Sequence, residues 1–175
     1  MTTLPYRSER LREAHDTLHF HCGTEGLDEW LTASAMGADR SDTARTFVWS
    51  NRSLVVAYFA LCPHVLRRST LPGRWNRTGP HEIPAILLAK LALDGALHGR
   101  GLGQQLLVDA LARASRATDE VGGRVVVVDA IDAPAHSFYA HFGFTSLPEG
   151  STRLVMRTSD VRASLAATPV LGEDE

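Results

Sequence analysis

The sequence lacks the features that mark several special classes of protein. Its two cysteines, Cys22 and Cys62, cannot form the disulfide framework that a small secreted protein needs. No apolar run approaches the roughly 18 residues of a membrane span, and the first residues lack the apolar core of a signal peptide. We therefore expect a cytoplasmic protein with reduced thiols and no membrane partner.

Lysine is nearly missing too, since Lys90 is the one lysine beside 17 arginines. The formal net charge of −2 excludes a protein that coats nucleic acid through bulk charge. Between Asp42 and Glu82, however, six arginines occur without an acidic residue. Arginine donates two parallel hydrogen bonds to phosphate, so this segment predicts nucleic-acid contacts, although a solvated loop could have the same composition. The candidate contacts are Arg67, Arg68, Arg74, Arg77 and Lys90.

The length and the apolar content indicate an ordinary folded chain. Its 175 residues correspond to one domain at roughly 100–200 residues per domain, and 44% of them are apolar, which is close to the average for globular proteins. We expect one domain over residues 1–160 and a loose tail over residues 161–175.

Apolar periodicity places the expected elements. A helix is predicted after Thr24, and a hairpin over residues 46–49 and 54–61. Four prolines make residues 63–84 an irregular connection. A buried strand over residues 84–93, a glycine loop, a helix that ends at Val121 and a valine-rich strand over residues 124–130 then form a βαβ unit. A short helix over residues 135–142 and a strand over residues 152–156 follow. The fold class is α/β with a parallel pair at its centre.

The glycine loop over residues 98–103 lies directly between the buried strand and the long helix. Its backbone can approach a ligand closely, and the helix presents unpaired N–H groups at its positive end, so a phosphate group is the natural ligand. The third glycine of a dinucleotide fingerprint is missing, and Gln104 stands where a P-loop needs lysine. A tight turn without a ligand is the alternative.

This loop resembles the acyl-CoA signature of the GNAT acetyltransferases, Arg/Gln-x-x-Gly-x-Gly/Ala, with His98 departing at the first position. The resemblance implies the GNAT fold, a mixed central sheet flanked by helices, with a splayed parallel strand pair forming the acyl-CoA cleft. It also implies acetyl-CoA as co-substrate, with no metal. The pantetheine arm would pair with Leu91, Ala92 and Leu93, and the pyrophosphate would bind the backbone amides of Gly99, Arg100, Gly101, Leu102, Gly103 and Gln104; His98, which begins the loop, is also a candidate cofactor-binding residue.

Five further segments, residues 19–23, 27–31, 45–48, 91–93 and 138–144, occur in an order similar to one GNAT branch. That branch comprises the acetyltransferase toxins of toxin–antitoxin modules. The resemblance covers about residues 18–158 and implies that the substrate is aminoacyl-tRNA, that acetylation blocks translation, that a ribbon-helix-helix antitoxin is a partner, and that the protein is a homodimer.

Tyr139 is the candidate catalytic residue. The resemblance implies that it protonates the CoA sulfur, whereas the alternative is that it only packs with the neighbouring phenylalanines. Five side chains could serve as a general base, but no spacing distinguishes any of them; they are His81, Glu82, Asp94, Asp129 and His136. An α-amino group with a pKa near 7.7–8.0 is substantially neutral at cellular pH, so a dedicated base is unnecessary.

His19, His21 and Cys22 lie close together in sequence but lack a second pair of ligands at zinc spacing, so we expect no metal there.

Two other functional interpretations remain open. A GNAT enzyme that acts on a small amine or a protein N-terminus shares the same fold. The second alternative is a non-catalytic CoA-binding module, which is permitted because His98 departs from the acyl-CoA signature.

Overall fold

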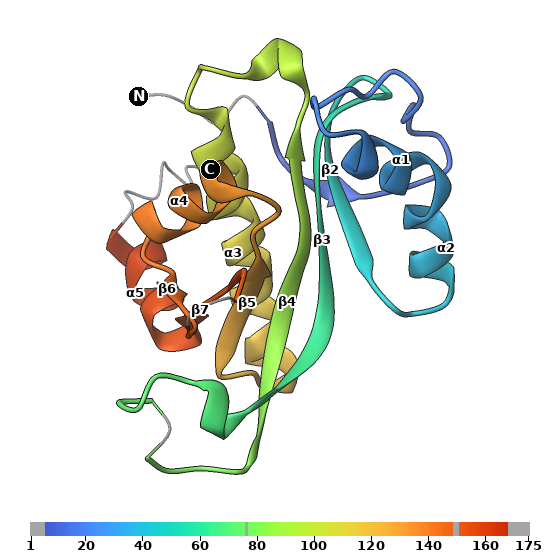
Figure 1. Ribbon diagram of the computed structural model, residues 1–175. Coiled ribbons are helices and arrows are strands. Elements are labelled where there is room, and N and C mark those ends of the chain that lie inside the picture. The colour runs from blue at the N-terminus through green and yellow to red at the C-terminus, as the bar shows by residue number, and fades with distance from the viewer. Residues whose placement is uncertain (1–5, 76, 149–150, 168–175) are drawn as a thin grey trace, which may run out of the picture.

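The computed structural model describes residues 6–75, 77–148 and 151–167. Its centre is a seven-stranded sheet with the order β1-β2-β3-β4-β5-β7-β6 (Figure 1). The strands are β1 (Glu9–Arg10), β2 (Arg45–Asn51), β3 (Leu54–Arg67), β4 (Glu82–Leu93), β5 (Val125–Asp129), β6 (Thr145–Ser146) and β7 (Arg153–Arg157). Only β4 and β5 are parallel neighbours in this sheet. The predicted α/β class with a central parallel pair is therefore confirmed.

Helices cover both faces of the sheet (Figure 1). They are α1 (Glu25–Ala33), α2 (Ala35–Arg40), α3 (Leu102–Val121), α4 (Ala133–His141) and α5 (Thr158–Ala167), with the short turns η1 (Arg68–Thr70) and η2 (Gly95–Leu97). Helices α1 and α2 lie on one face, and α3 lies on the other. The predicted apolar stripe of α3 is buried from Leu106 to Ala114, but Val121 is 81% exposed, because the helix has passed its packing partners there.

The consecutive valines of β5 are explained by burial on both sides of the strand. Val126 and Val128 share a core with Leu106 on α3. Val125 and Val127 share a second core with Trp75, from the connection between β3 and β4. That connection therefore covers the face of the sheet opposite α3.

The prediction of an irregular segment over residues 63–84 is wrong at both ends. Strand β3 continues to Arg67 and β4 begins at Glu82, so only residues 68–81 connect them. Pro63 pairs with Ile86, and Pro84 pairs with Val65, in the exposed end of this hairpin. Proline is tolerated in such a position because a missing N–H costs little where the strand is exposed.

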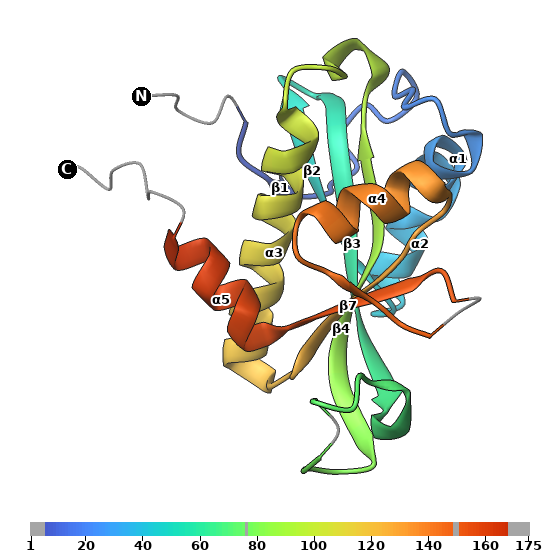
Figure 2. The same cartoon turned by 60° about the vertical axis from the view of Figure 1, so that its left-hand side comes forward.

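The prediction of a loose tail from residue 161 also fails over the described part. Helix α5 continues to Ala167 beside α3 (Figure 2), and Val161 is fully buried. Arg162 also donates to Asp119 of α3 at 2.8 Å. Residues 168–175 lie outside the described residues. Within the described ranges, no helix combines the length and the apolar character that a membrane span requires.

Candidate functional site

Strands β4 and β5 separate halfway along β4. The parallel ladder ends where Leu88 pairs with Val128, yet β4 continues to Leu93 and pairs there only with β3. Ala89 is the cause, because Ala60 pairs with Lys90 while Leu61 pairs with Leu88, which leaves one extra residue on β4. Such a bulge bends its strand. The β5-facing backbone groups of the last residues of β4 consequently have no partner in the sheet.

The loop after β4 leads into an uncapped helix. Gly101 precedes α3 with a φ of 72°, and no side chain caps the first turn. Gly99 has a φ of 77°, so both positions favour glycine. A Cβ placed at Gly99, Gly101 or Gly103 meets nothing within 4 Å. The backbone therefore faces open space at the positive end of α3, which fits the pyrophosphate of acetyl-CoA.

His98 turns back toward the strand that it follows. Its Nε2–H donates to the carbonyl oxygen of Leu93 at 2.7 Å, while Asp94 accepts from the backbone N–H of Ala96 at 3.0 Å. The two side chains fix the path of the loop between β4 and α3. His98 therefore contacts the Leu93 carbonyl oxygen, at the position where the acyl-CoA signature has arginine or glutamine.

Tyr139 lies on α4, which begins at a cap formed by Asp132 on the N–H of Ala135. Its ring is 8% exposed and makes edge contacts with Phe138 and Phe144. Burial raises the pKa of Tyr139 to about 12. Within the described part of the chain, its hydroxyl makes no hydrogen bond, so a packed ring carries a hydroxyl with no fixed partner.

Tyr139 belongs to the same apolar core as Leu88 and Val128, the last ladder pair before the strands separate. Leu102, the first residue of α3, is also part of that core. These side chains, although far apart in sequence, therefore all belong to the apolar core on the α3 side of the sheet.

The candidate bases are engaged in other contacts. Asp129 accepts two hydrogen bonds from Arg153, at 2.8 and 2.9 Å, and these lower the pKa of its carboxyl. Asp94 also accepts from the backbone N–H of His21, and His136 Nε2 lies 2.8 Å from the hydroxyl of Ser146. His81 and Glu82 are exposed at the far end of β4.

Sequence reasoning missed the arrangement around Arg153. Arg153 Nη1 donates to Nε2 of His64 at 3.0 Å, in addition to its pair with Asp129. Burial, together with the positive charge of Arg153, lowers the pKa of His64. The three residues come from β3, β5 and β7, and no short-range spacing in the sequence could have grouped them. Asp129 and Arg153 line a hollow beside the end of β5.

Residues 19–31, which precede and begin α1, are fixed against the sheet by side-chain contacts. Asp28 accepts from the backbone N–H of Cys22 at 2.9 Å and contacts Nδ1 of His21 at 3.1 Å. Trp30 stacks on Tyr58 with ring centroids 6.0 Å apart. These contacts hold α1 and the preceding loop against β3, next to the open half of β4.

The cysteine in this segment keeps its thiol proton at neutral pH. Burial is the main cause that raises the pKa of the Cys22 thiol to about 11. His19 pairs with Asp16 rather than with His21. Across the described ranges, no cluster of three or more His, Cys, Asp and Glu side chains could hold a metal ion.

The predicted nucleic-acid contacts fall into separate groups. Arg74 and Arg77 line one cavity at the N-terminal end of β5, whereas Arg67 and Arg68 line a neighbouring hollow. Lys90 lies instead over the ring of Trp30 at 5.6 Å, on the open half of β4. The structure therefore does not bring the five together.

Comparison with known proteins decides the family. No protein-family model matches the chain. It is 36% identical over 154 residues to the tRNA-acetylating toxin of Mycobacterium tuberculosis, and this match covers 88% of the chain and 93% of the relative. The chain belongs to the family of tRNA-acetylating GNAT toxins.

Solved structures of another toxin, AtaT, have the same fold as this GNAT toxin. AtaT complexed with acetyl-methionyl-tRNAfMet superposes with a TM-score of 0.83 at 27% identity, over 91% of this chain and 98% of the other. The AtaTR complex bound with AcCoA gives a TM-score of 0.79 at 27% identity, over 91% and 97%. A mutant of AtaT bound to the C-terminus of the antitoxin AtaR gives a TM-score of 0.78 at 25% identity, over 91% and 97%. The predicted GNAT fold and toxin branch are confirmed.

Proposed function

We propose that this GNAT toxin transfers the acetyl group of acetyl-CoA to the amino group of aminoacyl-tRNA. The observation that carries the proposal is the relation to a tRNA-acetylating toxin over nearly the whole of both chains. The separated strands and the uncapped, glycine-lined start of α3 supply the geometry for acetyl-CoA. An acetylated amino group has lost its nucleophilic lone pair to an amide, so the charged tRNA can no longer form a peptide bond.

The chain contributes binding and one proton to this reaction. Bound acetyl-CoA supplies a thioester, and the amine nitrogen bonds to its carbonyl carbon as the carbon–sulfur bond breaks. The backbone of Leu91, Ala92 and Leu93 would hold the pantetheine arm, and the amides of residues 99–104 the pyrophosphate. His98 sets the loop path and orients the Leu93 carbonyl.

Tyr139 would donate its phenolic proton to the departing thiolate, and the proton that the attacking nitrogen releases on becoming an amide returns through solvent to the phenolate. With a pKa near 12 it stays protonated at neutral pH, so the proton is always available. The ammonium form of the acceptor loses its proton to water, because its pKa near 7.7–8.0 leaves a substantial neutral fraction. A reaction that needs no dedicated base agrees with the structure, because Asp94, Asp129 and His136 are held in contacts with other residues.

The deciding experiment mixes purified protein, labelled acetyl-CoA and a pool of charged tRNA. We expect acetylated aminoacyl ends after mild hydrolysis of the ester. A pool that stays unmodified, while the same protein binds acetyl-CoA and acetylates a small amine or a protein N-terminus, would refute the tRNA substrate and leave the GNAT chemistry intact.

We further propose an antitoxin partner, since AtaT binds the C-terminus of AtaR. Co-expression with the product of an adjacent ribbon-helix-helix gene should relieve growth arrest and yield a stable complex. Homodimer formation remains a prediction, which light scattering of the purified protein would check.

A further inference from the structure

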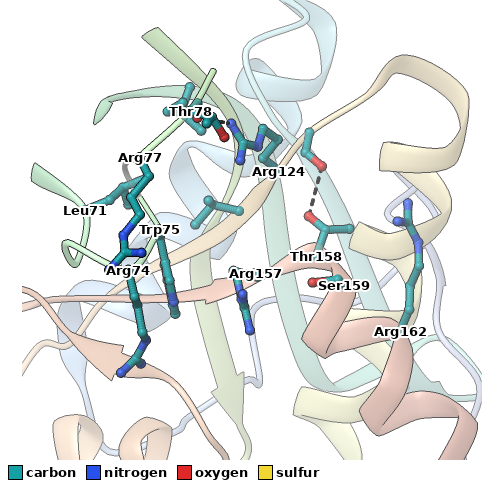
Figure 3. Close-up of a pocket in the computed structure, with 13 residues that line it drawn as sticks. Leu71, Arg74, Trp75, Arg77, Thr78, Arg124, Arg157, Thr158, Ser159 and Arg162 are labelled. Atoms are coloured by element: carbon teal, nitrogen blue, oxygen red, sulfur yellow. Dashed lines mark hydrogen bonds between the residues drawn. The ribbon is translucent and has the colours of Figure 1, made fainter. Parts of the chain in front are cut away.

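A cavity at the end of the molecule opposite the glycine loop gathers arginines from four segments. It encloses about 380 Å³ below the N-terminal end of β5 (Figure 3). The arginines belong to the connection after η1, the turn before β5, the end of β7 and helix α5; they are Arg74, Arg77, Arg124, Arg157 and Arg162. No acidic side chain is among the described residues that line it.

The positive charge of this cavity is only partly neutralised. Arg157 pairs with Asp160, and Arg162 pairs with Asp119, both at the surface. Arg74, Arg77 and Arg124 form no ion pair with any residue that the structure describes; Arg124 donates only to the carbonyl oxygen of Thr78, at 3.3 Å. An excess of three positive charges therefore faces one cavity, at the positive end of the α5 dipole.

Two of the five cavity arginines lie against a buried tryptophan. Trp75 is 9% exposed and packs into the core of Ile83 and Val125. The guanidinium carbons of Arg74 and Arg157 each lie 5.4 Å from its ring centroid, and Figure 3 shows the indole between them. Thr158, at the cavity wall, is fixed by a hydrogen bond from its hydroxyl to the carbonyl oxygen of Gly123. Trp75 thus fixes one guanidinium group from the connection and one from β7 at the cavity.

The position of the cavity rules out the phosphates of acetyl-CoA as its ligand. Ile83, at its wall, and Leu93, before the glycine loop, are ten residues apart on β4, which is roughly 33 Å of extended strand. The connection carrying Arg74 and Arg77 covers the face opposite α3. With the cofactor phosphates at the start of α3, this cavity beyond the other end of the same helix stays free for the second substrate.

We infer that this arginine cavity binds backbone phosphates of the tRNA body, at a distance from the acylated end that reacts. The inference rests on the proposed function for the substrate. Arg67 and Arg68 line the neighbouring hollow together with Glu82, so this end of the β3–β4 hairpin adds one further net positive charge. A row of separated guanidinium groups matches a phosphodiester chain, which carries one charge per nucleotide.

The test compares two doubly substituted proteins. Arg77→Gln with Arg124→Gln removes two charges from the cavity and leaves the arginines beside Trp75 intact. Arg7→Gln with Arg116→Gln removes two exposed arginines that, like Arg77 and Arg124, form no ion pair with a residue that the structure describes, and this variant serves as the matched control. Binding of deacylated tRNA is measured by fluorescence anisotropy over a range of salt concentrations.

We expect the cavity variant to bind tRNA about tenfold more weakly at 0.15 M salt and to lower the slope of log K against log salt by about 2, one unit for each lost phosphate contact. Its KM for charged tRNA should rise accordingly. Its rate with an amino acid esterified to the trinucleotide CCA, which lacks the tRNA body, should equal that of the wild type. The control variant should match the wild type in every measurement.

The outcomes separate this inference from the proposed function. If the cavity variant binds and acetylates charged tRNA like the wild type, the inference is overturned and the function stands. If it binds tRNA normally but loses the antitoxin, the cavity is a protein site and the inference is overturned. If the wild type acetylates no charged tRNA, yet the cavity variant alone binds tRNA weakly, the function fails and the RNA site stands.

Discussion

Tyr139 combines two properties that are usually found apart. Its ring packs against Phe138 and Phe144 like a core side chain, while its hydroxyl, as far as the structure describes the chain, has no hydrogen-bond partner. Packing fixes the direction of the ring, and the lack of a partner leaves the proton free for a substrate. The two roles that the sequence suggests for Tyr139, packing and catalysis, are therefore compatible.

Removing the Tyr139 hydroxyl should affect the reaction and not the fold. For Tyr139→Phe we expect turnover to fall by about 100-fold or more, the range of general acid catalysis, with acetyl-CoA affinity and stability unchanged. Tyr58→Phe is the matched control, because the Tyr58 hydroxyl donates to the carbonyl oxygen of Leu27 at 2.7 Å. That variant should lose about 1 kcal/mol of unfolding free energy and keep its turnover. Equal turnover of Tyr139→Phe and wild type would remove Tyr139 from the mechanism.

The raised pKa of Tyr139 predicts the form of the pH profile. Single-turnover acetylation should rise as the acceptor amine loses its proton and level off above pH about 8. The phenol must be protonated to act, and its pKa of about 12 keeps it protonated throughout. We therefore expect no alkaline decline up to pH about 10. A descending limb below pH about 9 would point to a different acid.

At the scale of elements, the two ends of α3 offer a direct test of the cofactor site. Gly101 and Gly122 have φ values of 72° and 84°, and both have open space where a Cβ would stand. Alanine should cost about 1 kcal/mol of stability at Gly101, in the left-handed helical region, and about 1–3 kcal/mol at Gly122, whose ψ of 170° lies in a region open almost only to glycine. Only Gly101→Ala should also weaken acetyl-CoA binding, by about tenfold, as calorimetry would measure. Equal affinities of the two variants would contradict a phosphate site at the start of α3.

The elements that the sequence predicts well are those with strong local signals. Strand β4, the glycine loop and α3 follow from apolar runs and glycines within about 40 residues of chain. The prolines at 63 and 84 were misleading, because a proline ends a strand only where its missing N–H would be needed. Helix α5 has a weak local pattern and is stabilised instead by contacts with α3 and by burial of Val161.

The site is less predictable than the elements, since it depends on which strands become neighbours. Asp129 and Arg153 face each other because β7 pairs with β5, and Arg153 also reaches His64 of β3. Arg124, in the turn between α3 and β5, reaches Thr78 in the connection between β3 and β4. No spacing in the sequence predicts any of these contacts. The phosphate loop, in contrast, is contiguous in sequence and could be recognised.

At the scale of the whole molecule, Asp109 joins three distant segments. It accepts from Trp49 Nε1 at 2.8 Å and from the hydroxyl of Ser8 at 2.7 Å, and Arg113 donates to the same serine. Trp49 is fully buried. Asp109→Ala should therefore lower the unfolding free energy by about 2 kcal/mol, because a buried donor loses its acceptor.

Urea denaturation would check this value against Asp119→Ala on the same helix. Asp119 pairs with Arg162 at the surface, and such pairs contribute at most about 1 kcal/mol. If both variants were equally stable, Asp109 would not hold the N-terminal segment to the rest of the fold.

The extra residue at Ala89 affects which mutations β4 can accept as the sequences of related proteins diverge. The groups that it leaves unpaired on β4 are peptide groups, which every residue except proline supplies in the same form. Mutations that exchange one side chain for another along Lys90–Leu93 leave those groups in place, whereas deletion of a single residue would move them all out of register. Natural variation should accordingly accept many substitutions in this half of the strand and reject insertions and deletions.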